Sequence, residues 1–243
     1  MLKVRNVRKL FGGVVANDAI SLDVARGSIV GLIGPNGSGK TTLFDSITGQ
    51  NRVDAGEITF DGRLLNGLTI GQIARLGAVR TFQQAHVCGG LTCLENMAIA
   101  GSHASEGYAA MLGRFDRALR EKAAALLEFV GLGEKREAPA RELSYGQRKL
   151  LEFAMALMNE PKMLLLDEPT AGVNPALGDH IVERLRRVNA GGITLFIIEH
   201  NMRVVMGLAE RIYCLAHGRL LASGTAAQIR SDPRVRAAYL GAA

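Results

Sequence analysis

The chain has 243 residues, of which 48% are hydrophobic and 21% are charged. This composition supports one sizeable core, or a core with a smaller domain, and argues against disorder. The longest apolar runs fall far short of the roughly 20 residues that span a bilayer. Charged residues interrupt the opening segment MLKVRNVRKLF, so it contains no continuous apolar stretch of the kind found in signal peptides. We therefore expect no secretory signal, and a cytosolic chain unless a partner holds it at a membrane.

Cysteine content and charge exclude further classes of protein. Cys88, Cys93 and Cys214 form an odd set without a C-x-x-C pair, which argues against a disulfide framework and a zinc site. The net charge is +6, but the basic residues are spread along the chain and only 5% of residues are aromatic. This pattern favours a solvated basic surface, one that can lie near anionic lipid, over a nucleic-acid site.

The first part of the chain predicts antiparallel strands. Residues Ala19–Val24 alternate apolar and polar side chains, which is the period of a half-buried strand. Residues Glu57–Leu65 repeat the alternation and contain Asp61-Gly62, a dipeptide typical of hairpin turns. A half-buried antiparallel sheet is therefore expected here.

Three later runs are almost continuously apolar, and they predict strands of a different kind. These runs are Ser28–Gly34, Met163–Asp167 and Ile193–His200. Strands that are buried on both faces, as in a parallel sheet covered by helices, have this composition. The sequence thus predicts a mainly parallel central sheet.

Helix signals lie between and after these runs. Asn174-Pro175 combines an N-cap residue with proline at the first helical position, and this helix is expected to stop at Gly191-Gly192. Thr225 is expected to cap a short helix near the C-terminus, in a capping box with the glutamine three residues later.

The segment from Gln84 to Glu142 interrupts the alternation of strands and helices. It has no buried-strand run and contains several helical stretches, notably Asp116–Val130, which Gly131 ends. We interpret it as a helical insert between two pieces of one α/β core.

The stretch GPNGSGKTT, from Gly34 to Thr42, predicts a phosphate-binding loop. It matches G-x-x-x-x-G-K-[ST] and lies between an apolar strand and a helix, which is the context that this motif requires. Backbone N–H groups and the helix dipole attract the phosphates, and the motif's lysine bridges the β- and γ-phosphates. We expect a nucleoside triphosphate to contact Gly34, Asn36, Gly37, Ser38, Gly39, Lys40, Thr41 and Thr42, with the Thr41 hydroxyl also on Mg²⁺.

The run MLLLDE supplies the second half of this predicted site. A buried strand brings Asp167 to its end, where a carboxylate can hold the Mg²⁺ shell. Glu168 follows directly, beside the expected γ-phosphate, and can orient or deprotonate a water molecule. His200 stands at the end of another buried strand and completes this pattern.

The stretch ELSYGQRKLL predicts a second helix N-terminus suited to an anion. Ser144 is a good N-cap, Gly146 is small, and an apolar face follows. A helix start of this kind offers free N–H groups and a positive dipole end. The chain therefore carries two candidate phosphate sites.

Taken together, five motifs resemble those of ABC transporter ATPase subunits, over essentially the whole chain. They are GPNGSGKTT, RTFQ with Gln83, LSYGQ, MLLLDEP and IEH with His200. The resemblance implies a P-loop NTPase (RecA-like) α/β core with a mainly parallel sheet, an N-terminal antiparallel β subdomain and an inserted helical subdomain. It implies that residues 1–83 and 150–243 form the core. Residues 84–149 would then form the helical part, which carries the signature motif LSYGQ.

The same resemblance implies how the sites are used. Two cassettes would dimerise head to tail, so that Ser144, Gly146 and Gln147 bind the nucleotide of the partner. Glu168 resembles the general base and Asp167 the Mg²⁺-associated acid. Further residues with implied roles are Gln83 (γ-phosphate sensor and Mg²⁺ ligand), His200 (switch histidine) and Phe11 (stacking on adenine).

Three positions depart from the commonest family pattern. Tyr145 replaces a glycine, which costs little if its backbone is helical or extended. Asn174 replaces an aspartate, and we favour a capping role for it over a catalytic one. Asn201 replaces the aspartate that often follows the switch histidine, with no predicted effect.

Within the family, phrases such as AGVNP, IEHNM and AAYLG resemble the larger-type ATPase of branched-chain amino-acid importers. The implied partners are a second cassette, membrane permeases and, indirectly, an external substrate-binding protein, with the chain on the cytoplasmic face of the membrane. Urea importers and lipopolysaccharide exporters share much of this phrasing and stay open as alternatives. A non-transport ABC ATPase of ribosomes or DNA is the alternative from another class, and a P-loop kinase or GTPase would not explain Leu143–Gln147.

Overall fold

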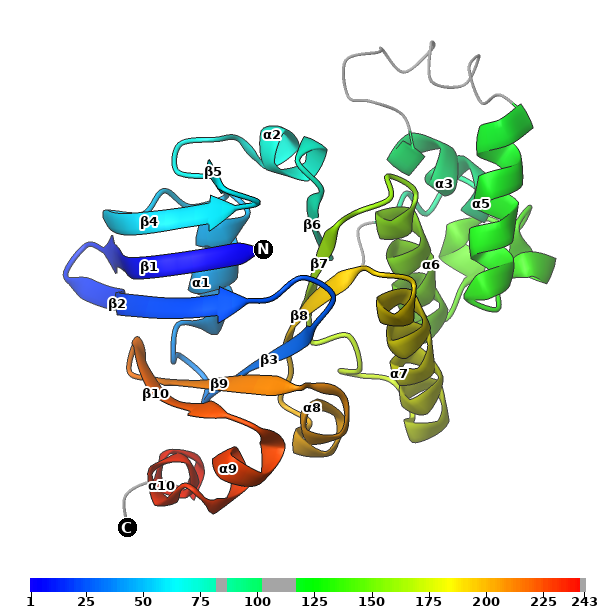
Figure 1. Ribbon diagram of the computed structural model, residues 1–243. Helices are drawn as coiled ribbons and strands as arrows, with labels where there is room; N and C mark the ends of the chain where they lie inside the picture. Colours follow the sequence, from blue (N-terminus) through cyan, green and yellow to red (C-terminus); the bar gives the residue numbers. More distant parts are fainter. Residues whose placement is uncertain (82–86, 102–116, 241–243) are drawn as a thin grey trace. The chain divides into compact units, whose positions relative to one another are not determined.

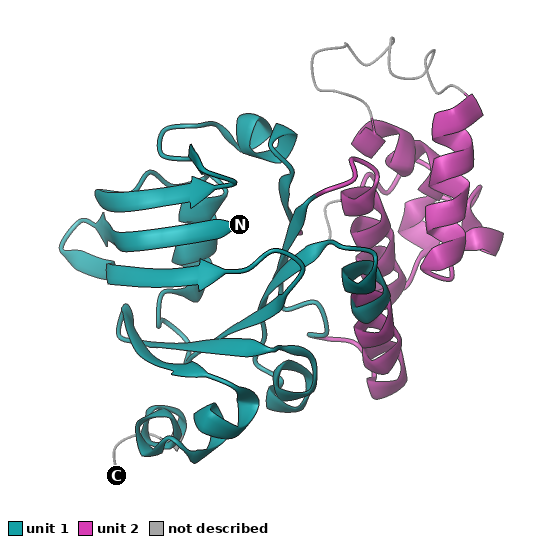
Figure 2. Cartoon of the chain, in the orientation of Figure 1, with its two compact units in different colours: residues 1–80, 162–171, 186–243 teal, residues 81–161, 172–185 magenta. Residues whose placement is uncertain are grey.

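The computed structural model describes residues 1–81, 87–101 and 117–240. Its chain forms two compact units (Figure 2). Unit 1 comprises residues 1–80, 162–171 and 186–243, and unit 2 comprises residues 81–161 and 172–185. Each unit therefore contains segments that are distant in the sequence.

Unit 1 contains a four-stranded antiparallel sheet in the order β2-β1-β4-β5 (Figure 1). Its strands are β1 (Leu2–Phe11), β2 (Val14–Val24), β4 (Ala55–Phe60) and β5 (Arg63–Leu64). The turn between β4 and β5 is Asp61-Gly62, and both residues have positive φ, 49° and 80°. The hairpin predicted from this dipeptide is confirmed.

The second sheet has six strands in the order β10-β9-β3-β8-β7-β6, and its middle is parallel. The strands are β3 (Ile29–Ile33), β6 (Ala78–Thr81), β7 (Met163–Asp167), β8 (Thr194–Ile198), β9 (Arg211–Ala216) and β10 (Arg219–Gly224). Every residue of β3, β7 and β8 is buried, which explains their continuous apolar runs. The antiparallel pair β9–β10 was not predicted.

The helices of unit 1 pack on these sheets. They are α1 (Lys40–Ile47), α2 (Ile70–Arg75), α8 (Met202–Leu208), α9 (Ala226–Ser231) and α10 (Pro233–Leu240). Helix α1 contributes Leu43, Phe44 and Ile47 to a core that both sheets share. Helices α8, α9 and α10 join a separate apolar cluster with β3, β9 and β10, and α9 begins at the predicted Thr225 capping box.

Unit 2 is mainly helical. It contains α3 (Cys93–Gly101), α5 (Arg117–Phe129), α6 (Tyr145–Leu157), two short 3₁₀ turns (Gly133–Lys135 and Ala140–Glu142) and the first part of α7 (Pro175–Ala190). Asn174 starts α7, because its Oδ1 accepts the Leu177 N–H at 2.9 Å. This confirms its predicted capping role.

The predicted fold class, an α/β protein with a mainly parallel sheet, an antiparallel β part and a helical part, is confirmed. Within the described part of the chain, every helix is too short or too polar to cross a bilayer.

Candidate nucleotide-binding site

The loop after β3 is folded so closely against its neighbours that two of its positions admit only glycine. Gly34 has φ 150°, and a Cβ there would lie 2.2 Å from the carbonyl oxygen of Leu215. Gly39 has φ 95°, and its Cβ would lie 2.3 Å from the oxygen of Ala16. Both distances are far below van der Waals contact, so the P-loop glycines are required by packing as well as by backbone conformation.

The N-terminus of α1 is left open to an anion. Its N-cap, Gly39, has no side chain to bind the first N–H groups, and the first turn holds no acidic residue. These N–H groups and the positive dipole end are therefore available to a phosphate. Buried Asn17 braces the loop from β2, because its Nδ2 donates to the Gly39 oxygen at 3.0 Å.

Lys40 is the first residue of α1, and its buried side chain folds back into the loop. Its Nζ donates to the oxygen of Gly34 at 2.8 Å and to that of Pro35 at 3.0 Å. Burial lowers the pKa of Lys40, and the nearby Glu168 and Asp167 oppose that shift. An anionic ligand in the loop would favour the charged amine in the same way.

The other residues predicted to contact phosphate surround this amine. Ser38 is buried, while Asn36, Gly37 and Thr41 are exposed and Thr42 is half-buried. The loop therefore presents a buried base and an open rim, as a ligand cradle requires.

A buried ion-pair network joins Asp167 to α1. Arg80 on β6 donates from Nη2 to Asp167 Oδ2 at 2.7 Å, and the same guanidinium pairs with Asp45 of α1. Burial raises the pKa of Asp167, and the hydrogen bond from Arg80 opposes this. Neither Arg80 nor Asp45 was predicted from the sequence. The available signal was a charged residue inside a short strand, three residues before Gln83.

Glu168 is held in a strained conformation next to His200. Its φ is 49°, a left-handed value that costs a non-glycine residue about 1–2 kcal/mol. Its N–H donates to the oxygen of Ile198 at 2.9 Å, and its Oε1 lies 3.0 Å from His200 Nε2. The structure thus brings together two predicted catalytic side chains from the ends of two parallel strands.

Glu199 ties the loops after β7 and β8 together, and it too was missed. It is 2% exposed, and one carboxylate oxygen accepts the N–H of Thr170 at 2.9 Å and its hydroxyl at 2.6 Å. The other oxygen accepts the Asn201 N–H at 3.2 Å. The Asn201 side chain caps α8 by accepting two N–H groups, which gives this departure from the family pattern a structural role.

In unit 2, the signature stretch forms the N-terminus of α6. Ser144 and Gln147 make a reciprocal capping box, with N–H to side-chain distances of 3.3 and 3.0 Å. Gly146 is buried, and a Cβ there would lie 2.2 Å from Leu177 Cδ2. Tyr145 is the first helical residue, which satisfies the condition under which we expected its cost to be small.

Phe11 ends β1, and its side chain is 48% exposed. The Lys9 ammonium lies 5.2 Å from the ring centroid, and neighbouring Val14 is 67% exposed. An exposed aromatic ring beside exposed aliphatic groups is suited to stacking on a planar ligand. Gln83 lies outside the described residues.

These residues fit both a nucleoside triphosphate and Mg²⁺. The uncapped α1 N-terminus and the buried Lys40 amine match phosphate oxygens. The described residues include no cluster of three or more acidic, His or Cys side chains that could hold a metal. Mg²⁺ does not need such a cluster, because it usually takes one or two protein oxygens together with phosphate and water. Asp167 and the Thr41 hydroxyl are donors of that type.

The fold and this site define a P-loop nucleotide-binding protein. Residues 17–171 match the family described as ABC transporter. The C-terminal residues 219–243 match a second family, described as branched-chain amino acid ATP-binding cassette transporter. The chain therefore belongs to the ABC transporter family, and its activity is that of an ATPase.

Relatives and solved structures agree with this assignment. The chain is 38% identical to a probable branched-chain amino acid transport ATP-binding protein LivG of Archaeoglobus fulgidus, covering 100% of this chain and 96% of the relative. It is 40% identical to the high-affinity LivG of Salmonella typhimurium, covering 100% and 98%. A crystal structure of a nucleotide-free ATP-binding cassette superposes with a TM-score of 0.90 at 35% identity, over 100% of this chain and 99% of the other.

Two further structures concern nucleotide and dimerisation. A crystal structure of the ADP conformation of an ATP-binding cassette matches with a TM-score of 0.90 at 35% identity, over 100% and 99% of the chains. A dimeric cassette bound to ADP and phosphate matches at 0.78 and 26% identity, over 93% and 99%. The predicted nucleotide binding is confirmed at the level of the family.

Proposed function

We propose that this chain hydrolyses ATP to power the import of branched-chain amino acids through partner permeases. The relatives of 36–40% identity that match the whole chain carry names of branched-chain amino acid transport ATP-binding proteins. The C-terminal match at residues 219–243 supports the same substrate class.

The pairing of strained Glu168 with His200 is the observation that carries the proposed hydrolysis. Strain of this kind persists only where the surrounding structure enforces it, and it gathers at active sites. In the proposed reaction, the Glu168 carboxylate takes a proton from a water molecule while the oxygen of that water bonds to the γ-phosphorus. The bond from that phosphorus to the β–γ bridging oxygen breaks, and ADP leaves with the electron pair. His200 holds Glu168 in place and contacts the γ-phosphate.

We assign the remaining binding roles to the loop and its neighbours. Lys40 and the backbone N–H groups from Asn36 to Thr42 bind the phosphates, and Phe11 stacks on adenine. Mg²⁺ would be held by Thr41, Asp167 and Gln83, and it supplies charge neutralisation on the β- and γ-phosphates.

The two units also have separate roles in the assembly that we propose. Unit 1 acts as the ATPase core, and unit 2 acts as the helical subdomain that carries Ser144, Gly146 and Gln147. These three residues bind the nucleotide of a second cassette in a head-to-tail dimer. The dimer works on the cytoplasmic face of the cell membrane with permease subunits and an external substrate-binding protein, and no nucleic acid takes part.

The base assignment is tested with Glu168→Gln in the complete transporter. We expect ATP turnover to fall about 10²–10⁴-fold, the usual contribution of a positioned base, while ATP binding survives. The variant should also accumulate an ATP-bound dimer, measured by light scattering. Glu57→Gln, at an exposed position of β4, is the matched control. Normal turnover in Glu168→Gln would refute the assignment.

The transported substrate needs a separate measurement. Vesicles that contain the whole transporter, with its binding protein, should accumulate labelled leucine or isoleucine when ATP is present. Uptake of urea in place of these amino acids would favour the urea-importer alternative. Export of lipopolysaccharide would also refute the proposed substrate.

A further inference from the structure

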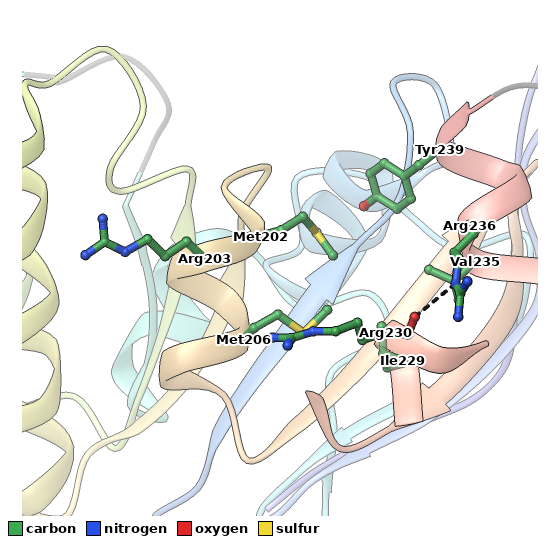
Figure 3. Close-up of a pocket in the computed structure, with 8 residues that line it drawn as sticks. All are labelled: Met202, Arg203, Met206, Ile229, Arg230, Val235, Arg236 and Tyr239. Atoms are coloured by element: carbon green, nitrogen blue, oxygen red, sulfur yellow. Dashed lines mark hydrogen bonds between the residues drawn. The ribbon is translucent and has the colours of Figure 1, made fainter. Parts of the chain in front are cut away.

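A second pocket lies in unit 1, between α8, α9 and α10 (Figure 3). Its volume is about 420 Å³, within the roughly 300–1,000 Å³ of small-molecule sites. Met202 and Met206 line it from α8, and Val235 and Tyr239 line it from α10. None of the residues in the proposed hydrolysis lines this pocket, so it needs an explanation of its own.

The lining is apolar with arginines among it. Ile229 and Arg230 contribute from α9, Arg236 from α10 and Arg203 from α8. Arg236 donates to the backbone oxygen of Arg230 at 3.2 Å. Among the described residues, Arg230 and Arg203 make no ion pair with a carboxylate. Figure 3 shows Arg230 extending toward α8, whereas Arg203 extends away from the other lining residues.

This lining selects the charge of a ligand. Arginine fits a carboxylate, which it can bind through two parallel hydrogen bonds. Among the described residues, no acidic side chain lines the pocket, so an ammonium group would have no carboxylate partner from them. The methionines, which adapt their shape readily, suit an unbranched apolar body. The chemistry is therefore that of an aliphatic carboxylate, not of a zwitterionic amino acid.

The volume of the pocket limits the size of the ligand. At the ~30 Å³ that one water molecule takes in the liquid, 420 Å³ holds roughly 14 heavy atoms. A saturated carboxylate of about twelve carbons has that size, so dodecanoate is a suitable probe.

One lining residue of the pocket lies close to the nucleotide loop. The hydroxyl of Tyr239 is near enough to the backbone N–H of Gly34 for that N–H to lower its pKa. Burial has the larger effect and raises the pKa of this hydroxyl to about 12. Because Gly34 is the first residue of the P-loop, a ligand that contacts Tyr239 is separated from the phosphate cradle by one side chain.

We propose that this pocket binds a medium-chain aliphatic carboxylate, with its head at Arg230, and that the occupant tightens nucleotide binding through Tyr239 and Gly34. A ligand against the Tyr239 ring restricts its motion, so less order remains to be gained when ATP enters the loop. Coupling of this kind is reciprocal, so nucleotide must also tighten carboxylate binding. The site goes beyond the proposed ATPase function and does not depend on it.

Binding is tested without nucleotide, using dodecanoate below its micelle concentration. The chain has eight methionines, so ¹³C-methyl labelling gives eight reporters. We expect saturable binding at one site, with the largest shifts at Met202 and Met206. Arg230→Glu should weaken dodecanoate binding at least tenfold and allow dodecyltrimethylammonium to bind. Arg63→Glu, at an exposed position of β5, changes net charge equally and should have no effect.

Coupling is tested by titrating MgATP with and without dodecanoate. We expect its Kd to fall about fivefold or more, the lower range of measured couplings. Tyr239→Phe keeps the ring and removes the hydroxyl, so dodecanoate should still bind but leave the Kd unchanged. The proposal is overturned if dodecanoate does not bind, if Arg230→Glu binds it equally, or if the MgATP Kd does not respond. Because neither measurement requires hydrolysis or transport, failure of the proposed ATPase mechanism would leave them interpretable.

Discussion

The two helix N-termini that the sequence marked as anion sites are built in opposite ways. At α1, the N-cap is Gly39, which has no side chain, and the first N–H groups are left for a ligand. At α6, Ser144 and Gln147 bind each other's backbone N–H groups in a complete capping box. The first end depends on a ligand for its hydrogen bonds, and the second is already stable.

This difference fits the division of labour that we propose. A phosphate-binding helix start must leave its first N–H groups uncapped, so that the phosphates can accept hydrogen bonds from them. A surface that only completes the site of a partner subunit has to keep its shape while that partner is absent. The Ser144 hydroxyl accepts an N–H from its own helix, which leaves its O–H to donate to an incoming phosphate.

The largest expected effect is on the ion pairs of Arg80, which connect α1 to β7. Arg80→Met should lower the free energy of unfolding by about 3–5 kcal/mol, because it leaves buried Asp167 and half-buried Asp45 without their common partner. Urea denaturation measures this change. Arg63→Met, at an exposed position, is the matched control, and equal stability of the two variants would contradict the network.

Lys40→Ala tests whether the α1 end binds nucleotide. We expect ATP affinity to fall by about 1.5–3 kcal/mol, or 10–150-fold, because hydrogen bonds to charged groups are lost. Equilibrium titration with a fluorescent ATP analogue measures the change. Lys3→Ala, at an exposed site, should bind normally. Tight binding by Lys40→Ala would refute the cradle.

Two glycine variants separate backbone conformation from packing within the loop. Gly37 and Gly39 both have positive φ, but a Cβ at Gly37 meets nothing within 4 Å. Gly39→Ala should therefore lose about 1–3 kcal/mol more stability than Gly37→Ala, which is the usual cost of overpacking. Thermal or urea unfolding of the pair measures the difference, and equal losses would show that packing at Gly39 is unimportant.

The smallest expected effect is at α6. Ser144→Ala should lower the free energy of unfolding by about 1 kcal/mol through loss of the N-cap, and Ser144→Thr should restore most of it. If Ser144 serves the partner's nucleotide, turnover by the dimer should fall while ATP binding by the monomer stays the same. Unchanged turnover in Ser144→Ala would argue against the shared site.

Local sequence determined much of the fold and part of the site. The apolar runs gave β3, β7 and β8 because a strand buried on both faces needs apolar residues throughout. Asp61-Gly62 gave a turn, and Asn174 and Ser144 gave helix starts, because each acts within three residues of itself. The P-loop was readable for the same reason, since its donors are consecutive residues.

Only the tertiary structure could reveal the long-range contacts. Arg80 meets Asp167 across 87 positions, and Glu199 meets Thr170 across 29, so no local pattern contains either pair. The strain at Glu168 and the approach of Tyr239 to Gly34 likewise depend on which distant segments lie together. The sequence by itself determined which residues can do the chemistry, since motif and turn energies act within a few residues. Packing of distant segments decided how those residues are held, because burial sets the cost of every unpaired charge and added atom.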